Sequence, residues 1–151
     1  MDENDKRILN ILQEDVKVSY KEIADKLGLA ASTIHARVKK MEKNGVIKNC
    51  SAIIDFKKVG YNTIAWIGLS VDPTKMNEVA EQLSNFEEIQ VVAVSTGDHD
   101  VVAQIIAEDD KKLWKFINEN IKTIDGVLSK MDVSSFIDIN KYKSWWIPLK
   151  K

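Results

Sequence analysis

Residues 19–44 read SYKEIADKLGLAASTIHARVKKMEKN, and this stretch decides the fold of the first part of the chain. Ser19 and Glu22 have the spacing of a capping box, in which each side chain bonds the backbone of the other residue. A helix is therefore predicted to begin directly after Ser19. Gly28 ends it, because glycine adopts the left-handed conformation of a helix C-cap without a steric penalty. After a tight turn, a second, mainly basic helix is predicted over residues 31–44.

The flanking residues complete a DNA-binding arrangement. Upstream, apolar residues recur with helical spacing over residues 2–14 and predict an earlier helix. The basic helix has an apolar stripe of its own at Ile34, Val38 and Met41. Downstream, residues 46–49 and 52–54 read as two short β segments that would form a wing. Helix, capped helix, glycine turn, basic helix and ribbon follow one another as in a winged helix-turn-helix domain, which binds DNA.

Beyond residue 61 the hydrophobic period alternates between strands and helices. Strands are predicted over residues 63–71, 89–95, 101–107 and 127–139, and helices over residues 73–86 and 109–124. This βαββαβ order is ferredoxin-like, so the predicted fold class is α+β, with a winged helix-turn-helix followed by a ferredoxin-like domain. We expect the domains to span residues 1–50 and 63–151. A linker strand and hinge at 51–62 would join them.

The strand predicted over residues 101–107, VVAQIIA, is apolar on both of its faces. The two helices of a βαββαβ unit cover only one face of the sheet. A large exposed apolar face is uncommon in a monomer, so a second copy of the chain is expected to cover it. The sequence therefore predicts a homodimer.

Composition and charge narrow the classes of protein. The chain has 151 residues, of which 44% are hydrophobic and 30% charged, an ordinary globular balance. With only one cysteine, Cys50, with no apolar run of membrane-spanning length and with an acidic N-terminus, MDENDKR, we expect a cytoplasmic protein that contacts no membrane. Net charge is −1, yet residues 32–48 contain five basic residues and one acidic residue. Such a local basic patch is typical of a nucleic-acid contact.

Several motifs resemble the Lrp/AsnC (leucine-responsive or feast/famine) family of transcriptional regulators. They are the first block, MDENDKRILNILQEDVKVSYKEIADKLGLAASTIHARVKKMEKNGVI, the joint IIDFKKVGYN, the turn TGDHD and the segment IDGV. The resemblance implies a winged helix-turn-helix joined to a ferredoxin-like regulatory (RAM) domain. It also implies dimers or octamers, palindromic operators in double-stranded DNA, and a small effector, an amino acid.

The predicted basic helix supplies the candidate DNA contacts. They are its non-core residues Ser32, Thr33, His35, Ala36, Arg37, Lys39 and Lys40. Ser32 and Thr33 lie at the helix start, which suits a phosphate, although Ser32 could serve only as a cap. His35 and Ala36 are candidates for base edges, and the lysines for phosphates. Arg37 could reach a base, a phosphate or an intramolecular carboxylate.

The turn TGDHD supplies the candidate effector site. Gly97 permits a positive φ and close approach of a ligand, and Asp100 could accept from an ammonium group. A plain hairpin turn explains the same residues. The family resemblance implies that Gly97 and Asp100 contact the effector, while Asp98 and His99 tune its identity. Family members commonly have a hydroxyl residue where this chain has Asp132. The aspartate indicates either that the ligand is cationic or polar, or that no ligand binds.

Two other functions fit the sequence less well than a transcriptional regulator does. Siroheme decarboxylases share the two-domain plan, but their histidine-asparagine-tyrosine run is missing here, where the equivalent stretch contains only His99. The chain has no close set of catalytic or metal-ligating residues and no phosphate-binding glycine motif, so we expect no enzyme activity, cofactor or metal. An effector-binding protein without DNA function conflicts with the intact basic helix. The adjacent Trp145 and Trp146 are predicted to be packing residues, at a subunit interface for example.

Overall fold

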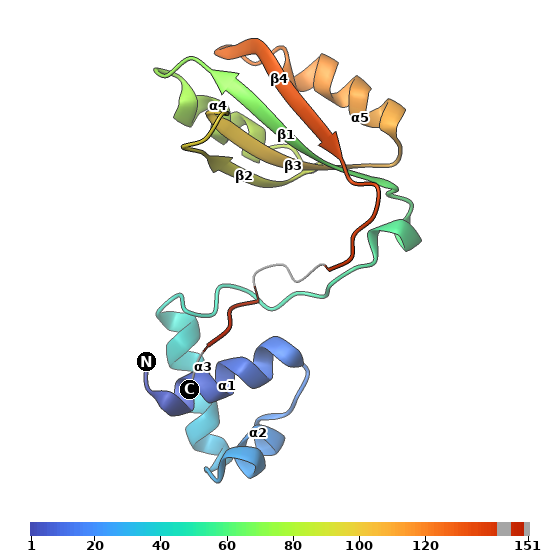
Figure 1. The fold of residues 1–151 in the computed structure, drawn as a ribbon. Helices are drawn as coiled ribbons and strands as arrows, with labels where there is room; N and C mark the ends of the chain where they lie inside the picture. The colour runs from blue at the N-terminus through green and yellow to red at the C-terminus, as the bar shows by residue number, and fades with distance from the viewer. Residues whose placement is uncertain (142–145, 150–151) are drawn as a thin grey trace. The chain divides into compact units, whose positions relative to one another are not determined.

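The structure is a computed structural model that describes residues 1–141 and 146–149. The chain divides into two compact units (Figure 1). The first comprises Met1–Ile53 together with Lys141 and the described tail residues 146–149, and the second comprises Ile54–Asn140. The second domain was expected to run to the end of the chain, so the placement of the tail differs from the prediction. Trp145 lies outside the described residues, and Trp146 belongs to the tail.

The first unit consists of three helices with the predicted caps. They are α1 (Glu3–Glu14), α2 (Tyr20–Leu27) and α3 (Ala31–Lys43). The capping box at the start of α2 is confirmed: the Ser19 hydroxyl accepts from the Glu22 N–H, and the Glu22 carboxylate accepts from the Ser19 N–H. Gly28 ends α2 with a φ of 66°, and this left-handed residue lets the chain turn directly into α3.

The core of this unit is built from the predicted apolar stripes. Ile8 of α1, Ile23 of α2 and Ile34 of α3 are fully buried, and Val38 and Met41 extend the same stripe along α3. Because residues 34, 38 and 41 face inward, the polar residues between them face outward. The packing of the three helices therefore fixes which side of α3 is presented to a partner.

The predicted wing strands are wrong. Within residues 44–55, all of which the structure describes, no strand forms. The N–H groups of Val46 and Ile47 instead bond the carbonyl of Met41, and Ile47 packs against the helical core. Two strands of three or four residues have too few hydrogen bonds to persist without a third strand beside them. The chain then forms a short 3-10 helix, η1 (Phe56–Val59), at the expected hinge.

The second unit has the predicted ferredoxin-like topology. Its elements are β1 (Thr63–Val71), α4 (Met76–Ser84), β2 (Ile89–Val94), β3 (Val101–Ala107), α5 (Asp110–Phe116), the π-helical turn η2 (Ile117–Ile121) and β4 (Val127–Ser135). The sheet order is β2-β3-β1-β4, and all neighbouring strands are antiparallel. The α+β fold class is confirmed.

Four elements of the second unit differ from their predicted length: α4 covers Met76–Ser84 rather than residues 73–86, β2 ends at Val94 rather than at residue 95, and the α5 helix and the last strand differ as follows. The α5 helix changes to the π-helical turn η2 at Ile117, and this change keeps Ile117, Ile121 and Ile124 buried against the sheet. The last strand ends at Ser135 rather than at residue 139. Ser135 pairs with Ala65, and the Phe136 N–H donates to the Ile64 carbonyl. At this point β4 has reached the beginning of β1, so β1 offers no further residues with which β4 could pair.

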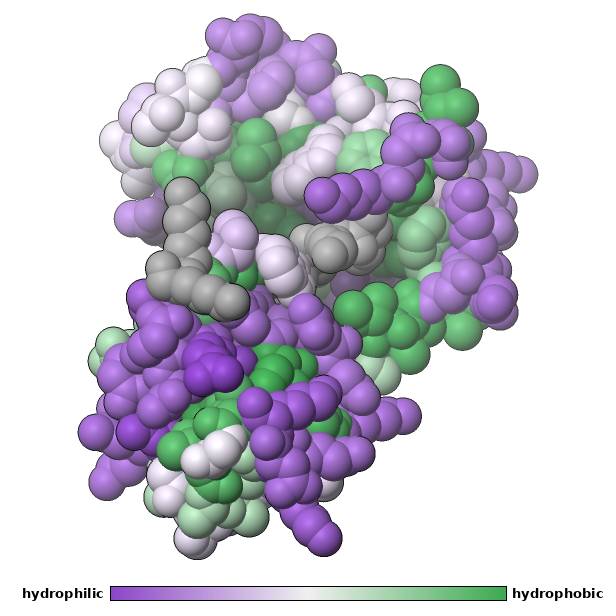
Figure 2. Space-filling model, turned by 60° about the horizontal axis from the view of Figure 1, so that its bottom comes forward, coloured by the Kyte–Doolittle hydropathy of each residue, from purple (hydrophilic) through white to green (hydrophobic). Residues whose placement is uncertain are grey.

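Both helices pack on one face of the sheet, as predicted. Val79 and Leu83 of α4 and Leu113 of α5 share a core with Ile67 and other alternate residues of the strands. The other face presents large side chains to solvent: Trp66 is 38% exposed, and Leu128, which alternates with the inward residues of β4, is 49% exposed. On the side of the molecule drawn in Figure 2, hydrophobic residues reach a mainly hydrophilic surface in separate patches. No helix in the described part of the chain is long and apolar enough to cross a membrane.

Candidate nucleic-acid interface and effector site

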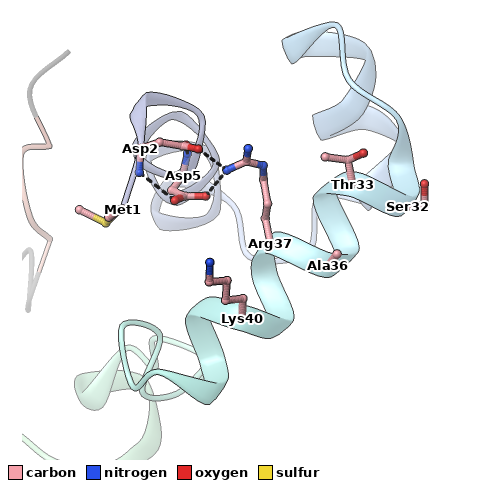
Figure 3. Close-up of a pocket in the computed structure, with 8 residues that line it drawn as sticks. All are labelled: Met1, Asp2, Asp5, Ser32, Thr33, Ala36, Arg37 and Lys40. Carbon is pink, nitrogen blue, oxygen red and sulfur yellow. Dashed lines mark hydrogen bonds and ion pairs between the residues drawn. The ribbon is translucent and has the colours of Figure 1, made fainter.

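One face of α3 opens onto a hollow of about 650 Å³ between this helix and the start of α1. From α3 it is lined by Ser32, Thr33, Ala36, Arg37 and Lys40, and from α1 and its cap by Met1, Asp2 and Asp5 (Figure 3). The α3 residues lie three or four positions apart, so they share one side of the helix. Five of the seven predicted DNA contacts therefore come together on one surface.

Arg37 is the one member of this surface that is held by acidic groups. Its Nη1 atom lies 2.7 Å from a carboxylate oxygen of Asp2 and 2.7 Å from one of Asp5. Figure 3 shows the guanidinium reaching from α3 to the two carboxylates. These bonds raise the pKa of Arg37, and the pKa of Asp2 is lowered by the Asp5 N–H and by Arg37. Arg37 was a candidate for contact with a base, a phosphate or an intramolecular carboxylate, and in the structure it pairs with intramolecular carboxylates.

The start of α3 is not capped by a side chain. Ala30 is the N-cap residue and makes no side-chain cap bond with the described residues, so a capping role for Ser32 is wrong. Ser32 is exposed and Thr33 half-buried in the first turn that follows. An uncapped helix start leaves backbone N–H groups directed outward, where the helix dipole favours an anion.

His35 and Lys39 lie outside the hollow. The His35 ring packs edge-to-face on Tyr20 of α2, with ring centroids 5.6 Å apart. Lys39 lies 2.8 Å from a carboxylate oxygen of Glu42, and this bond raises the pKa of Lys39. The predicted contacts thus divide into the surface of the hollow and a second flank that faces α2.

The TGDHD turn joins β2 to β3, and Asp100 closes it. The Asp100 carboxylate accepts from the Val71 N–H at 2.8 Å, and the Asp100 N–H donates to the Leu69 carbonyl at 2.9 Å. Asp100 therefore ties the turn to β1. Gly97 is exposed and is not among the glycines of positive φ in the described chain, so the turn does not use the backbone freedom that the sequence offered.

His99 and Asp132 meet on the sheet face opposite the helices. The His99 Nε2 atom lies 3.4 Å from an Asp132 carboxylate oxygen. The imidazole packs directly on Gly68 of β1, where a side chain as small as a methyl group would overlap it. The two residues line a cavity of about 380 Å³ together with Trp66, Ile67, Gly68, Val102 and Ser134. The His99 Nδ1 atom is buried and has no hydrogen-bond partner among the described residues.

Comparison with known protein families finds a match for each of the two units. Residues 1–48 match a family model described as winged helix-turn-helix DNA-binding. Residues 62–149 match one described as the PF0864 C-terminal dimeric alpha+beta barrel domain. An uncharacterized HTH-type transcriptional regulator of Pyrococcus furiosus is 43% identical over 129 residues, which are 85% of this chain and 87% of the relative. The chain belongs to the Lrp/AsnC family.

One further relative of this Lrp/AsnC chain and one solved structure of the same fold each cover most of its length. The HTH-type transcriptional regulator LrpA of Pyrococcus horikoshii is 40% identical over 127 residues, 84% of this chain and 90% of the relative. A transcriptional regulator of Neisseria meningitidis, solved as a complex with L-Met, superposes with a TM-score of 0.88 at 22% identity, over 95% of this chain and 94% of that one. The Lrp/AsnC chain is a transcriptional regulator with a helix-turn-helix DNA-binding domain.

Several residues of the two sites in this Lrp/AsnC protein were not predicted. Asp2 and Asp5 were read only as part of an acidic N-terminus, although their spacing is that of a capping box, which the structure contains. Trp66 and Gly68 lie within the strand predicted over residues 63–71, and nothing in the sequence marks them as site residues. Their alternation with Ile67 placed them on the outer face, but only the strand register reveals that Gly68 lies beside Asp132.

Proposed function

We propose that the protein regulates transcription by inserting α3 into the major groove of a palindromic operator, with its DNA affinity set by an amino acid. The observation that carries the proposal is the shared surface of Ser32, Thr33, Ala36 and Lys40 beside an uncapped helix start. In helix-turn-helix proteins the N-terminal part of the second helix contacts base edges, and flanking donors contact phosphates.

The chemistry of each side chain suits one part of this contact. Ser32 and Thr33 offer hydroxyls in the first turn of α3, whose start has no side-chain cap among the described residues, which suits a phosphate. Ala36 is exposed and small, so a thymine methyl group can approach it. Lys40 is exposed and has no ion-pair partner among the described residues, so its ammonium group is available to a phosphate. His35 and Lys39 would contact the flank of the site next to α2.

A palindromic operator requires two copies of α3 related by a two-fold axis. We propose that the sheet face with Trp66 and Leu128 pairs with the same face of a second copy. Such a pairing would remove from water the apolar surface that α4 and α5 leave uncovered. Larger assemblies, an octamer among them, would then be assemblies of these dimers.

We propose that the effector is an α-amino acid. Asp132 offers a carboxylate for an ammonium group, while the imidazole of His99 beside it offers a ring nitrogen that can donate to a ligand carboxylate. Trp66 adds an apolar wall to the same cavity. Gly97, Asp98 and Asp100 form the turn that positions His99, and exposed Asp98 would add to the ligand preference. The L-Met complex of the Neisseria regulator supports this ligand class.

Ligand binding would change DNA affinity through linkage. An effector that binds one assembly more tightly than another shifts the population toward it. No catalytic step is needed, and we propose that the protein acts without one. The siroheme-decarboxylase alternative predicts tight porphyrin binding, which absorbance titration with a porphyrin would detect.

Fluorescence anisotropy with duplex DNA at several salt concentrations tests the DNA proposal. Lys40→Ala should weaken binding across sequences and reduce the slope of log affinity against log salt by about 1. Lys115→Ala serves as the control, because Lys115 is an exposed lysine of α5 in the other unit. Equal salt slopes for the wild type and Lys40→Ala would contradict the proposed contact.

Isothermal titration with the twenty amino acids tests the effector proposal. Asp132→Asn keeps the size of the side chain and removes the charge, so binding should weaken by about tenfold or more. Glu81→Gln, on the exposed side of α4, is the matched control. Binding that is unchanged in Asp132→Asn would exclude this carboxylate from the site.

A further inference from the structure

The described end of the chain contacts the first helix of the DNA-binding unit. The Gln13 side chain donates to the Ile147 carbonyl at 3.1 Å and accepts from the Ile147 N–H at 2.7 Å. The Asn10 side chain donates to the Leu149 carbonyl at 3.2 Å. These three bonds join residues that are more than 130 positions apart in the sequence, and all of them lie within one compact unit.

The two amides recognise main chain rather than side chains. The Gln13 amide pairs with both backbone groups of Ile147, as the peptide group of a neighbouring strand would. Asn10 and Gln13 are three positions apart, so they share one side of α1. They engage tail residues on either side of Pro148, where the chain makes a tight turn, because the Leu149 N–H donates to the Ile147 carbonyl at 2.9 Å.

The composition of the tail fits this mode of binding. Ile147 is 60% exposed, so burial of its side chain adds little to the contact. Pro148, between the two bonded residues, has a fixed φ and no N–H that would lose a water partner on docking. Residues 141–151 contain four lysines and no acidic residue, whereas residues 1–15 contain five acidic and two basic residues. Attraction between these opposite charges brings the segments together.

We propose that Asn10 and Gln13 form a docking site on α1 for the C-terminal segment of the same chain, which thereby becomes part of the DNA-binding unit. The docked tail stabilises α1 against local opening, because α1 must remain helical for its two amides to stay in register. The occupant is the chain's own residues 146–149, whose backbone groups satisfy both amides.

Hydrogen exchange measured by mass spectrometry on the full-length protein without DNA tests this proposal. Gln13→Ala removes both bonds to Ile147, so amides of α1 and of the tail should exchange on the order of tenfold faster. Alanine is the better helix former, so helix propensity alone would slow exchange in α1. The two explanations therefore predict opposite signs.

Two more variants complete the experiment. Gln13→Glu places a second acceptor against the Ile147 carbonyl and should also speed exchange in both segments. Gln82→Ala, an exposed amide on α4, is the control and should leave α1 and the tail unchanged. Exchange in α1 that is unchanged or slower in Gln13→Ala would overturn the proposal. Because no DNA is present, this result is independent of whether α3 binds an operator.

Discussion

The Arg37 guanidinium of α3 lies 2.7 Å from the Asp5 carboxylate of α1. This ion pair joins the two helices, although the two residues are 32 positions apart in the sequence. Asp5 is also the third residue of α1, where its carboxylate accepts from the Asp2 N–H. One acidic side chain thus caps α1 and holds the middle of α3. The orientation of α3, the helix that we propose to contact DNA, therefore depends on the cap of α1.

Asp2→Asn should strengthen DNA binding. Asparagine caps a helix as well as aspartate does, so α1 is kept, but one of the two carboxylates that hold Arg37 loses its charge. Asp5 still pairs with Arg37, but the surface around the guanidinium loses one negative charge. Affinity for a duplex at low salt should therefore rise, with a salt slope steeper by about 1. Anisotropy titrations against a nonspecific duplex measure both quantities. Weaker binding by Asp2→Asn would mean that Arg37 must stay paired to hold α3.

Acid should destabilise the helix-turn-helix unit through two caps. The pKa of Asp2 lies below its ordinary value of 3.8 because it accepts from the Asp5 N–H and pairs with Arg37. The pKa of Glu22 lies below its ordinary value of 4.5 because it accepts from Ser19. A depressed pKa gives stability that is complete above the ordinary value and is lost as pH falls through the lowered one.

Thermal melts followed by circular dichroism should therefore show a melting temperature that falls as pH drops below about 4.5. Asp2→Asn and Glu22→Gln remove one titrating group each while keeping a hydrogen-bonding cap, so each should flatten this dependence. Curves that remain as steep as that of the wild type would show that other carboxylates control the acid response.

Gly68→Ala should break the contact between His99 and Asp132. A methyl group on Gly68 would occupy the position of the imidazole, so His99 must turn away, at a cost of about 1–3 kcal/mol in unfolding free energy. Binding of a proposed amino-acid effector should fall with it. Gly97→Ala is the control for unfolding free energy alone, because its added methyl group would meet the Ser95 hydroxyl at an ordinary 3.7 Å, while Gly97 itself belongs to the proposed effector turn.

Chemical denaturation and the NMR signals of the His99 ring measure the effect of Gly68→Ala. A His99 signal that matches that of the wild type and an unfolding free energy that matches that of Gly97→Ala would show that the ring moves aside freely. In that case the packing of His99 on Gly68 would have no role in the site.

Ser19→Ala should lower the free energy of unfolding of the helical unit by about 1 kcal/mol, because it removes the side-chain half of the capping box. Denaturant titration measures the change. Ser84→Ala is an instructive comparison: Ser84 lies at the end of α4 and bonds only a carbonyl of its own helix, so its loss should cost less. An equal loss in both variants would argue against a specific cap.

Local chemistry explains why much of the fold was predictable. The capping box at Ser19, the left-handed Gly28 and the stripe at Ile34 each act within a few residues, and all three occur as predicted. The strands Thr63–Val71 and Val101–Ala107 have their predicted bounds, because both are buried and strongly apolar. The wing failed since short strands need a partner that local sequence cannot supply.

The sites depend on contacts between distant residues. The basic surface of α3 follows from helical spacing, but the pairing of Arg37 with Asp2 and Asp5 requires the packing of α1 on α3. His99 and Asp132 were both candidates, yet only the register of β1 with β4 brings Asp132 beside Gly68 and hence beside His99. Sequence spacing identifies such residues one at a time and does not pair them.

The return of the tail to α1 has a practical consequence for dissecting the molecule. In topological terms residues 54–140 are an insertion within a module whose two pieces lie at opposite ends of the polypeptide. A fragment cut after residue 53 would lack the tail segment whose backbone groups bond the side chains of Asn10 and Gln13. A rearranged fragment that omits residues 54–140 and joins residues 141–151 to residue 1 through a flexible spacer would keep both pieces in one short polypeptide. Such a fragment is a better choice than residues 1–53 alone for isolating the helix-turn-helix unit.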